Sequence, residues 1–222
     1  MLERSKSQGV AELLVDALGH RDEEMRGMAV EILGTIGLEK YVMQMAECLR
    51  DPHPTVRWKA AYALQKARSV KAVEPLVEAL RDRSSDVRWC AAFALGTIGS
   101  EKAVEGLIAC LDDPHIEVKY HAASSLGWIR DERAVKPLLK LLVQGSANKP
   151  RRSAAFALGN FKDKTVIGPL TQSLADADPE VRSGAAYSLG KIGSEEGACR
   201  AHLNGATFFA PKPHPRQRAA HG

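Results

Sequence analysis

The aromatic residues of this 222-residue chain recur at fixed intervals, and several follow a basic residue directly. Trp58, Trp89 and Tyr120 lie 31 residues apart, and a second set of rings lies four residues further along. The candidate partner-binding residues are Trp58, Tyr62, Trp89, Phe93, Tyr120, Phe156 and Tyr187, with Lys59 and His121 beside them. Because Trp and Tyr often dominate binding energy, this pattern predicts non-covalent recognition of another protein.

Reactive chemistry has little support in the sequence. The histidines at 53, 115 and 121 lack the spacing of metal ligands, and no Ser-His-Asp grouping stands out. No Gly-rich phosphate loop follows a strand, because the sequence predicts no strands. We therefore expect no catalytic residue, no metal and no cofactor, and interpret the protein as a non-enzyme.

The four cysteines, at 48, 90, 110 and 199, form no C-x-x-C pair, which favours a reduced, cytoplasmic protein. Cys48 and Cys110 share a position that alanine occupies in other units, so we expect them in the core. Cys90 is expected near the rings, where Arg88, Lys59 and His121 could lower its pKa. A reactive or ligand-linking Cys90 is therefore an alternative to a purely structural thiol.

A repeat of about 31 residues must position these side chains. A basic residue recurs with steps of 31, 31, 31, 32 and 31, and a leucine follows it seven residues later each time. The basic residues are Arg26, Arg57, Arg88, Lys119, Arg151 and Arg182. This period predicts six units, starting near residues 10, 41, 72, 103, 134 and 166.

Each unit is expected to contain two helices. Apolar residues at helical spacing, as in 103–111, predict the first helix of each unit. In the first unit of the chain, this helix should run from about Ser5 to Leu18. Asp-Pro pairs at 51, 113 and 178 are expected to cap the second helix, which closes on a Gly-x-x-Gly stretch such as 96–99. Since one such pair cannot bury its own apolar face, the pairs must stack into a superhelix.

A helical wheel separates a buried side of the second helix from an outward side. Val87, Ala91 and Leu95 fall on the buried arc, whereas Trp89 and Phe93 point away from it. Seven of the twelve aromatic residues occupy such outward positions. An exposed apolar stripe of this kind predicts an interaction surface. The alternative is that the rings fill space between adjacent units.

The recurring basic residue has a structural explanation. An aspartate precedes it in most units, as Asp22, Asp51, Asp82, Asp113 and Asp176. A guanidinium bonds a carboxylate through two parallel hydrogen bonds. We therefore expect an Arg–Asp ladder that links neighbouring units, rather than an anion-binding site.

Segments 51–64 (DPHPTVRWKAAYAL) and 86–107 (DVRWCAAFALGTIGSEKAVEGL) resemble HEAT-type repeats of the short class named after phycobilisome lyases. The resemblance covers about 10–196 and implies an all-α fold, a right-handed α-solenoid whose second helices line a concave groove. It implies a protein-interaction scaffold as the function. The alternative is a phycobilin lyase subunit or bilin-handling chaperone of the E/F type, with a bilin beside Cys90 and His121.

Charge argues against a nucleic-acid partner. Four of the 31 basic residues lie in 197–222, which has no acidic residue, so the other 27 balance the 27 acidic residues. A duplex-binding array would show a basic face across its repeats. No apolar run approaches the length of a membrane span. We expect neither nucleic acid nor membrane as a partner.

The two ends of the chain depart from the repeat. We interpret 1–196 as the repeat array and 197–222, with three prolines in five residues, as an irregular and disordered tail. A solenoid usually needs polar caps at its ends. Since neither end shows one, self-association through the repeat ends is a further hypothesis.

Overall fold

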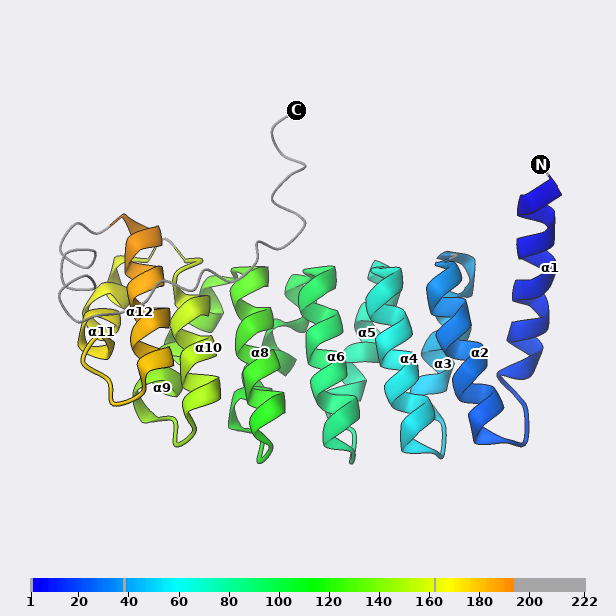
Figure 1. Ribbon diagram of the computed structural model, residues 1–222, viewed down its shortest axis with the longest axis horizontal. Helices are drawn as coiled ribbons and strands as arrows, with labels where there is room; N and C mark the ends of the chain where they lie inside the picture. Colours follow the sequence, from blue (N-terminus) through cyan, green and yellow to red (C-terminus); the bar gives the residue numbers. More distant parts are fainter. Residues whose placement is uncertain (1, 38, 162, 194–222) are drawn as a thin grey trace.

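The computed structural model describes residues 2–37, 39–161 and 163–193, and the side chains from residue 9 onward. This part of the chain forms twelve α-helices, arranged as six successive pairs along one row (Figure 1). The first helices of the pairs are α1 (Leu2–Ala17), α3 (Val42–Glu47), α5 (Val73–Ala79), α7 (Val104–Ala109), α9 (Val135–Gln144) and α11 (Ile167–Ser173). The second helices are α2 (Glu23–Ile36), α4 (Pro54–Ala67), α6 (Ser85–Ile98), α8 (Ile116–Ile129), α10 (Asn148–Leu158) and α12 (Pro179–Ile192).

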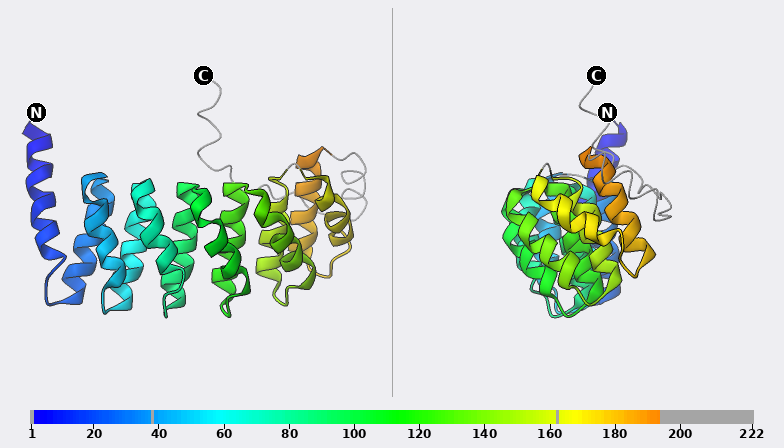
Figure 2. Two further views of the ribbon diagram at one scale, coloured as in Figure 1. Left: turned by 180° about the vertical axis from the view of Figure 1, so that it is seen from behind. Right: turned by 90° about the vertical axis from the view of Figure 1, so that its left-hand side faces the viewer.

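The second helices form one layer and the first helices the other (Figure 1). Seen from behind, the pairs follow one another along the same row (Figure 2). A short 3₁₀ turn precedes each first helix from α3 on, and these turns end at Tyr41, Ala72, Ala103, Ala134 and Val166, where units were predicted to start. The six-unit all-α solenoid is confirmed for the described residues. The prediction for 197–222 lies outside them.

The core runs along the whole row between the two layers. The buried side that the helical wheel predicted for the second helix is confirmed, because Val87, Ala91 and Leu95 are buried completely. Leu76 and Leu107, from first helices, meet this layer and are equally buried. Alanines between the leucines allow the helices to pack closely, so each pair relies on its neighbours for burial.

The predicted ladder is confirmed at four junctions. Arg57 donates to both carboxylate oxygens of Asp82 at 2.7 and 3.0 Å, and its remaining nitrogen donates to the carbonyls of Asp51 and Pro52. The four pairs are Arg26–Asp51, Arg57–Asp82, Arg88–Asp113 and Arg151–Asp176. Arg26, Arg57 and Arg88 therefore tie their own loop to the loop of the next unit, whereas Arg151 donates to the carbonyl of Leu142 at the end of α9.

Parts of the capping and ladder predictions were wrong. Asp22 caps α2, accepting from the backbone N–H of Glu24 at 2.8 Å, and has no place in the ladder. In the four ladder pairs the aspartate lies 25 residues after the arginine. The residue 25 positions after Lys119 is Gln144, whose amide takes the place of the carboxylate. Asp178 caps α12 as expected, but α4 and α8 begin two residues later than Asp-Pro caps would require. The physical reason is that Asp51 and Asp113 are held by arginines of the preceding unit.

The glycines at the ends of the second helices have two roles, of which only one was predicted. Gly37, Gly99 and Gly193 close their helices in the left-handed conformation, as expected. The earlier glycine allows close helix approach, because a Cβ placed on Gly96 would lie 2.5 Å from the Cβ of Ser125 and 2.8 Å from its Cα. Gly34, Gly127 and Gly159 make the same kind of approach to the next second helix.

The ladder makes the stability of the fold depend on pH in the acid range. Burial alone would raise the pKa of Asp82, but hydrogen bonds from Arg57 and the Ser84 N–H, together with the guanidinium charge, lower that pKa below its ordinary 3.8. The pKa values of Asp51, Asp113 and Asp176 are lowered in the same way. A carboxylate with a lowered pKa stabilises the fold above its unfolded-state pKa and loses that contribution as the pH falls through the folded-state value.

We therefore expect the free energy of unfolding to fall steadily below about pH 4, as urea titrations at several pH values would measure. Asp82→Asn should cost about 2–3 kcal/mol at pH 7, because it leaves Arg57 without its carboxylate in a largely buried place. It should also lose less stability than the wild type between pH 5 and pH 2. Asp112→Asn is the control, since that side chain is 79% exposed. Equal pH dependence in Asp82→Asn and the wild type would contradict the ladder's role.

Candidate functional site

All seven predicted rings lie on second helices and are half-buried. We call this set the aromatic face: Trp58 and Tyr62 on α4, Trp89 and Phe93 on α6, Tyr120 on α8, Phe156 on α10 and Tyr187 on α12. Each ring rests partly on its surroundings and keeps part of its surface in solvent. The two indoles at 58 and 89 are therefore neither core residues nor free side chains.

On α4, the rings of Trp58 and Tyr62 stack on each other one helical turn apart. Their centroids are 5.9 Å apart and their planes differ by 7°. The ammonium of Lys66 lies 4.7 Å from the centroid of the Tyr62 ring, as a cation–π contact. Lys59, one of the predicted site residues, forms an ion pair with Glu31 of α2 at 3.2 Å. Its charge therefore already has a partner within the array.

His121 organises the centre of the aromatic face. Its imidazole stacks on Trp89 at 4.9 Å and meets the edges or faces of Phe93 and Tyr120 at 5.5 and 5.0 Å. Burial lowers the pKa of His121 to about 4; the negative charge of Glu117 opposes this shift and the positive charge of Lys149 adds to it. The ring is therefore neutral near pH 7, and packs as an aromatic member of this group.

Polar contacts hold two of these rings in place. The indole N–H of Trp89 donates to Asp86 at 3.2 Å. The ammonium of Lys149 lies 4.8 Å from the centroid of Tyr120 and is also bonded to Glu117. Such anchored rings lose little freedom when a ligand covers them, which favours binding.

A second group of rings lies towards the C-terminal end. Phe156 and Tyr187 are 5.4 Å apart, and the guanidinium of Arg152 lies 5.8 Å from the Phe156 centroid. Arg152 also pairs with Glu180 at 2.7 Å. Between the two groups, Ser124 occupies the ring position of α8 and bonds to Ser153 at 2.8 Å. On α8 the second ring position is thus polar, and Tyr120 is the member of the aromatic face on this helix.

Sequence reasoning missed Trp128, whose ring lies edge-on to Phe93 at 5.6 Å. Trp128 follows Lys119 by nine residues, as Lys66 follows Arg57. That third position along the second helix was the available signal, because it lies four residues, or about one turn, beyond the second ring position and therefore close to the face of the rings.

The alternative of a reactive Cys90 near the rings is contradicted, and the structural thiol remains. Its side chain is 1% exposed, and its thiol lies 3.9 Å from the carbonyl oxygen of Trp58 in the preceding unit. Burial raises the pKa of the Cys90 thiol to about 12, and the charge of Asp86 adds to this. Cys90 is therefore unsuited to act as a nucleophile or as a covalent anchor for a ligand. Cys48 and Cys110 are buried, as expected.

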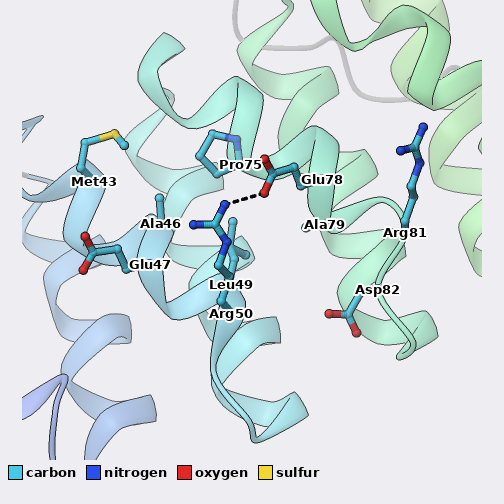
Figure 3. A pocket seen from close by; sticks show the side chains of 10 residues that line it. All are labelled: Met43, Ala46, Glu47, Leu49, Arg50, Pro75, Glu78, Ala79, Arg81 and Asp82. Carbon is cyan, nitrogen blue, oxygen red and sulfur yellow. Dashed lines mark hydrogen bonds and ion pairs between the residues drawn. The ribbon is translucent and has the colours of Figure 1, made fainter.

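Two shallow pockets lie along the first helices instead of on the aromatic face. One, of about 290 Å³, is formed between α3 and α5 by Met43, Arg50, Pro75, Glu78 and neighbouring residues (Figure 3). Its centre is crossed by the ion pair between Arg50 and Glu78, at 2.7 Å. The other is formed between α1 and the segment 44–51. Arg50 lines both pockets. Its salt bridge to Glu78 is exposed, and exposed salt bridges contribute little stability.

Within the described ranges, no three His, Cys, Asp or Glu side chains gather as ligands for a metal ion. The helices of the same ranges include none with the length and apolar character needed to cross a bilayer.

Comparisons with known proteins agree with the helical repeats. No curated protein matches the chain. Phycocyanin lyase from a Nostoc species, solved as the complex of CpcE and CpcF, is 25% identical, with a TM-score of 0.63 over 86% of this chain and 79% of that one. An engineered protein is also 25% identical, with a TM-score of 0.64 over 83% of this chain and 98% of that one.

A designed armadillo repeat protein in complex with the peptide (KR)4 shares the fold, at 20% identity and a TM-score of 0.62 over 81% of this chain and 98% of that one. The family model described as HEAT repeats matches three overlapping stretches, residues 11–89, 73–149 and 135–201. Together these stretches span residues 11–201, from within α1 through α12. The chain belongs to the HEAT repeat family.

Proposed function

We propose that the protein is a non-enzymatic scaffold that binds a segment of a partner protein along the aromatic face. The observation that carries this proposal is the continuity of half-buried rings over consecutive second helices, centred on Trp58, Trp89 and Tyr120. Rings that only filled space between repeats would be buried as fully as Leu95 or Leu126. A repeat scaffold provides the rigid support that such a surface needs.

The spacing of the repeats suits an extended segment. Packed helices lie about 8–10 Å apart, and an extended chain advances about 3.3 Å per residue. A segment that crosses the second helices therefore meets a new helix about every third residue. The pair on α4 and the His121 group on α6 and α8 would then receive apolar side chains three residues apart. A helical partner segment rises about 1.5 Å per residue, so positions six or seven residues apart would meet the rings of successive second helices.

The experiment is a selection of peptides from a phage-displayed library on the full-length protein, followed by affinity measurement of the enriched sequences. We expect apolar or aromatic side chains among them at a spacing of about three residues, or of about seven residues in a helical peptide. The double variant Trp58→Ala/Trp89→Ala should fail to retain these phages, and Val143→Ala, altered at an exposed residue of α9, should retain them. Equal retention by both variants would refute the proposal.

We propose the cytoplasm as the place where this scaffold works. Three cysteines are free and buried in the described part of the chain. Thiols without disulfide partners are usual in a reducing compartment.

A second candidate function is a subunit that acts on the linkage between a bilin and a protein, which would make the chain part of a lyase. The similarity to phycocyanin lyase from Nostoc favours it. Since Cys90 is buried, a bilin would have to lie on Trp89 and His121 without a covalent bond to this thiol. Adding phycocyanobilin to the purified protein should shift the bilin absorption band if this function holds. An unchanged spectrum would exclude it.

A further inference from the structure

Four cationic side chains lie at the C-terminal ends of second helices. These helices run parallel, so their C-terminal ends share one edge of the layer (Figure 1). Lys66 and Lys191 belong to the last turns of α4 and α12, and Arg68 and Arg130 directly follow α4 and α8. All four side chains are exposed. We call these four residues the basic edge.

Contacts and repeat positions place the basic edge beside the aromatic face. The ammonium of Lys66 lies over the Tyr62 ring, 4.7 Å from its centroid. Lys191 occupies the position in α12 that Lys66 occupies in α4 and Trp128 in α8. Burial lowers the pKa of Lys191, and the positive charge of Arg130 lowers it further, so these two cations lie near each other. A ligand on the rings therefore lies next to these charges.

None of the four cations pairs with a carboxylate of the described ranges, and Lys191 donates to the amide oxygen of Asn160 instead. The acidic side chains that touch the aromatic face already have partners within the array. These contacts are Glu31–Lys59, Glu117–Lys149, Glu180–Arg152 and the bond from the Trp89 indole to Asp86. Glu24 of α2, where that helix carries no ring, is the exposed exception. The charge left for a partner is therefore mainly positive.

Two further acidic side chains at this end lead into the other layer. Glu101 and Glu132 lie in the 3₁₀ turns that precede α7 and α9. The residues after them, Lys102 and Arg133, form ion pairs with acidic side chains of α5 and α7. Asp131 is held by the guanidinium of Arg133 at 2.7 Å. These turns thus belong with the first helices, and the basic edge keeps its charge on the side of the rings.

The two arginines of the basic edge occupy a backbone conformation that is unfavourable for them. Arg68 and Arg130 have φ values of 51° and 63°, in the left-handed region. At the same place, three other second helices have Gly37, Gly99 and Gly193. Glycine adopts this conformation without a steric penalty, so the fold alone favours glycine here. Because such strain is typical of functional positions, the two arginines point to a role in binding.

We propose that the partner segment is acidic, with apolar side chains on the aromatic face and carboxylates against the basic edge. This inference rests on the proposed function, to which it adds the charge of the segment. Complementary charge speeds association and fixes register, while the rings provide most of the affinity. The acidic side of the segment lies towards the C-terminal ends of the second helices.

The double variant Arg68→Gly/Arg130→Gly separates binding from folding. Its thermal midpoint should equal or exceed that of the wild type, because glycine relieves the left-handed strain. Peptides selected from the phage-displayed library on the full-length wild type should be rich in Asp and Glu. The variant should bind them at least about tenfold more weakly at low salt, as fluorescence anisotropy measures. This difference should shrink in about 0.5 M NaCl, since salt screens exposed charges.

Two controls accompany this variant. Lys136→Gln/Lys140→Gln removes two exposed cations from α9, in the layer of first helices, and should bind the acidic peptides like the wild type. A selected peptide with Gln and Asn in place of Glu and Asp should bind the wild type and the arginine variant equally. Equal binding of this neutral peptide also shows that the aromatic face of the variant is intact.

Three results would overturn the inference. The first is a set of selected peptides without an excess of acidic residues, and the second is equal affinity of an acidic peptide for the wild type and Arg68→Gly/Arg130→Gly. The third is a DNA duplex that competes with the peptide and loses binding in this variant, which would assign the basic edge to nucleic acid.

The same peptides keep the inference distinguishable from the proposed function. If the peptides lack acidic residues but fail to bind Trp58→Ala/Trp89→Ala, the inference falls and the binding function of the aromatic face stands. If no selected peptide depends on these two indoles, the proposed function falls, and the inference falls with it.

Discussion

Gly96→Ala is expected to destabilise the protein by more than about 3 kcal/mol, although it adds one methyl group to a helix. Alanine normally stabilises an exposed helix relative to glycine by about 1 kcal/mol. At Gly96 the new Cβ would lie 2.5 Å from the Cβ and 2.8 Å from the Cα of Ser125. Because the obstacle is the backbone of α8, only a shift of one helix pair against the next can relieve the contact.

Gly168→Ala is the matched control, because a Cβ at Gly168 meets nothing within 4 Å and the residue lies in α11. This variant should be neutral or more stable by up to about 1 kcal/mol. Urea denaturation followed by circular dichroism measures both. If Gly96→Ala were as stable as Gly168→Ala, the inference that successive second helices approach each other closely at glycine would be contradicted.

Trp89→Ala is expected to weaken binding of a selected peptide more than tenfold, or by more than about 1.4 kcal/mol. The ring presents its exposed surface to the ligand and is held by the stack on His121 and the bond to Asp86. Its removal should cost at most about 2 kcal/mol of stability, because the fully buried Val87, Ala91 and Leu95 continue to hold α6. Isothermal titration calorimetry and urea unfolding measure the two effects.

Ile116→Ala is the control for Trp89→Ala, since Ile116 is 48% exposed at the start of α8 and lies outside the aromatic face. Its affinity for the peptide should equal that of the wild type. Should Trp89→Ala unfold at a much lower urea concentration and yet bind the peptide normally when folded, the ring would belong to the core and the proposed site would be refuted.

The repeat period gave the fold, and the reason is physical. Each unit needs its own basic residue and its own buried leucine seven residues later, so both recur about every 31 residues in the sequence. The ladder of Arg57 and Asp82 was predictable for the same reason. The departure at Gln144, which lies 25 residues after Lys119, can be read from the same spacing.

A helical wheel could not predict the burial of Cys90 or the partial burial of Trp89. A wheel assumes one buried side, whereas each inner second helix contacts its own first helix and both neighbouring second helices. Cys90 faces the preceding unit, where Trp58 covers it. The wheel placed it beside the rings because it contains no information about that neighbour. The close-approach role of Gly96 was missed for the same reason.

The indole N–H signals in a ¹⁵N–¹H correlation spectrum test the central claim most directly. The chain has three tryptophans, and a Trp→Phe variant assigns each signal. On addition of a selected peptide, the signals of Trp58 and Trp89 should shift in proportion to saturation. If both indole signals stayed in place at saturation while backbone signals of the first helices moved, the claim that the peptide binds on the aromatic face would be contradicted.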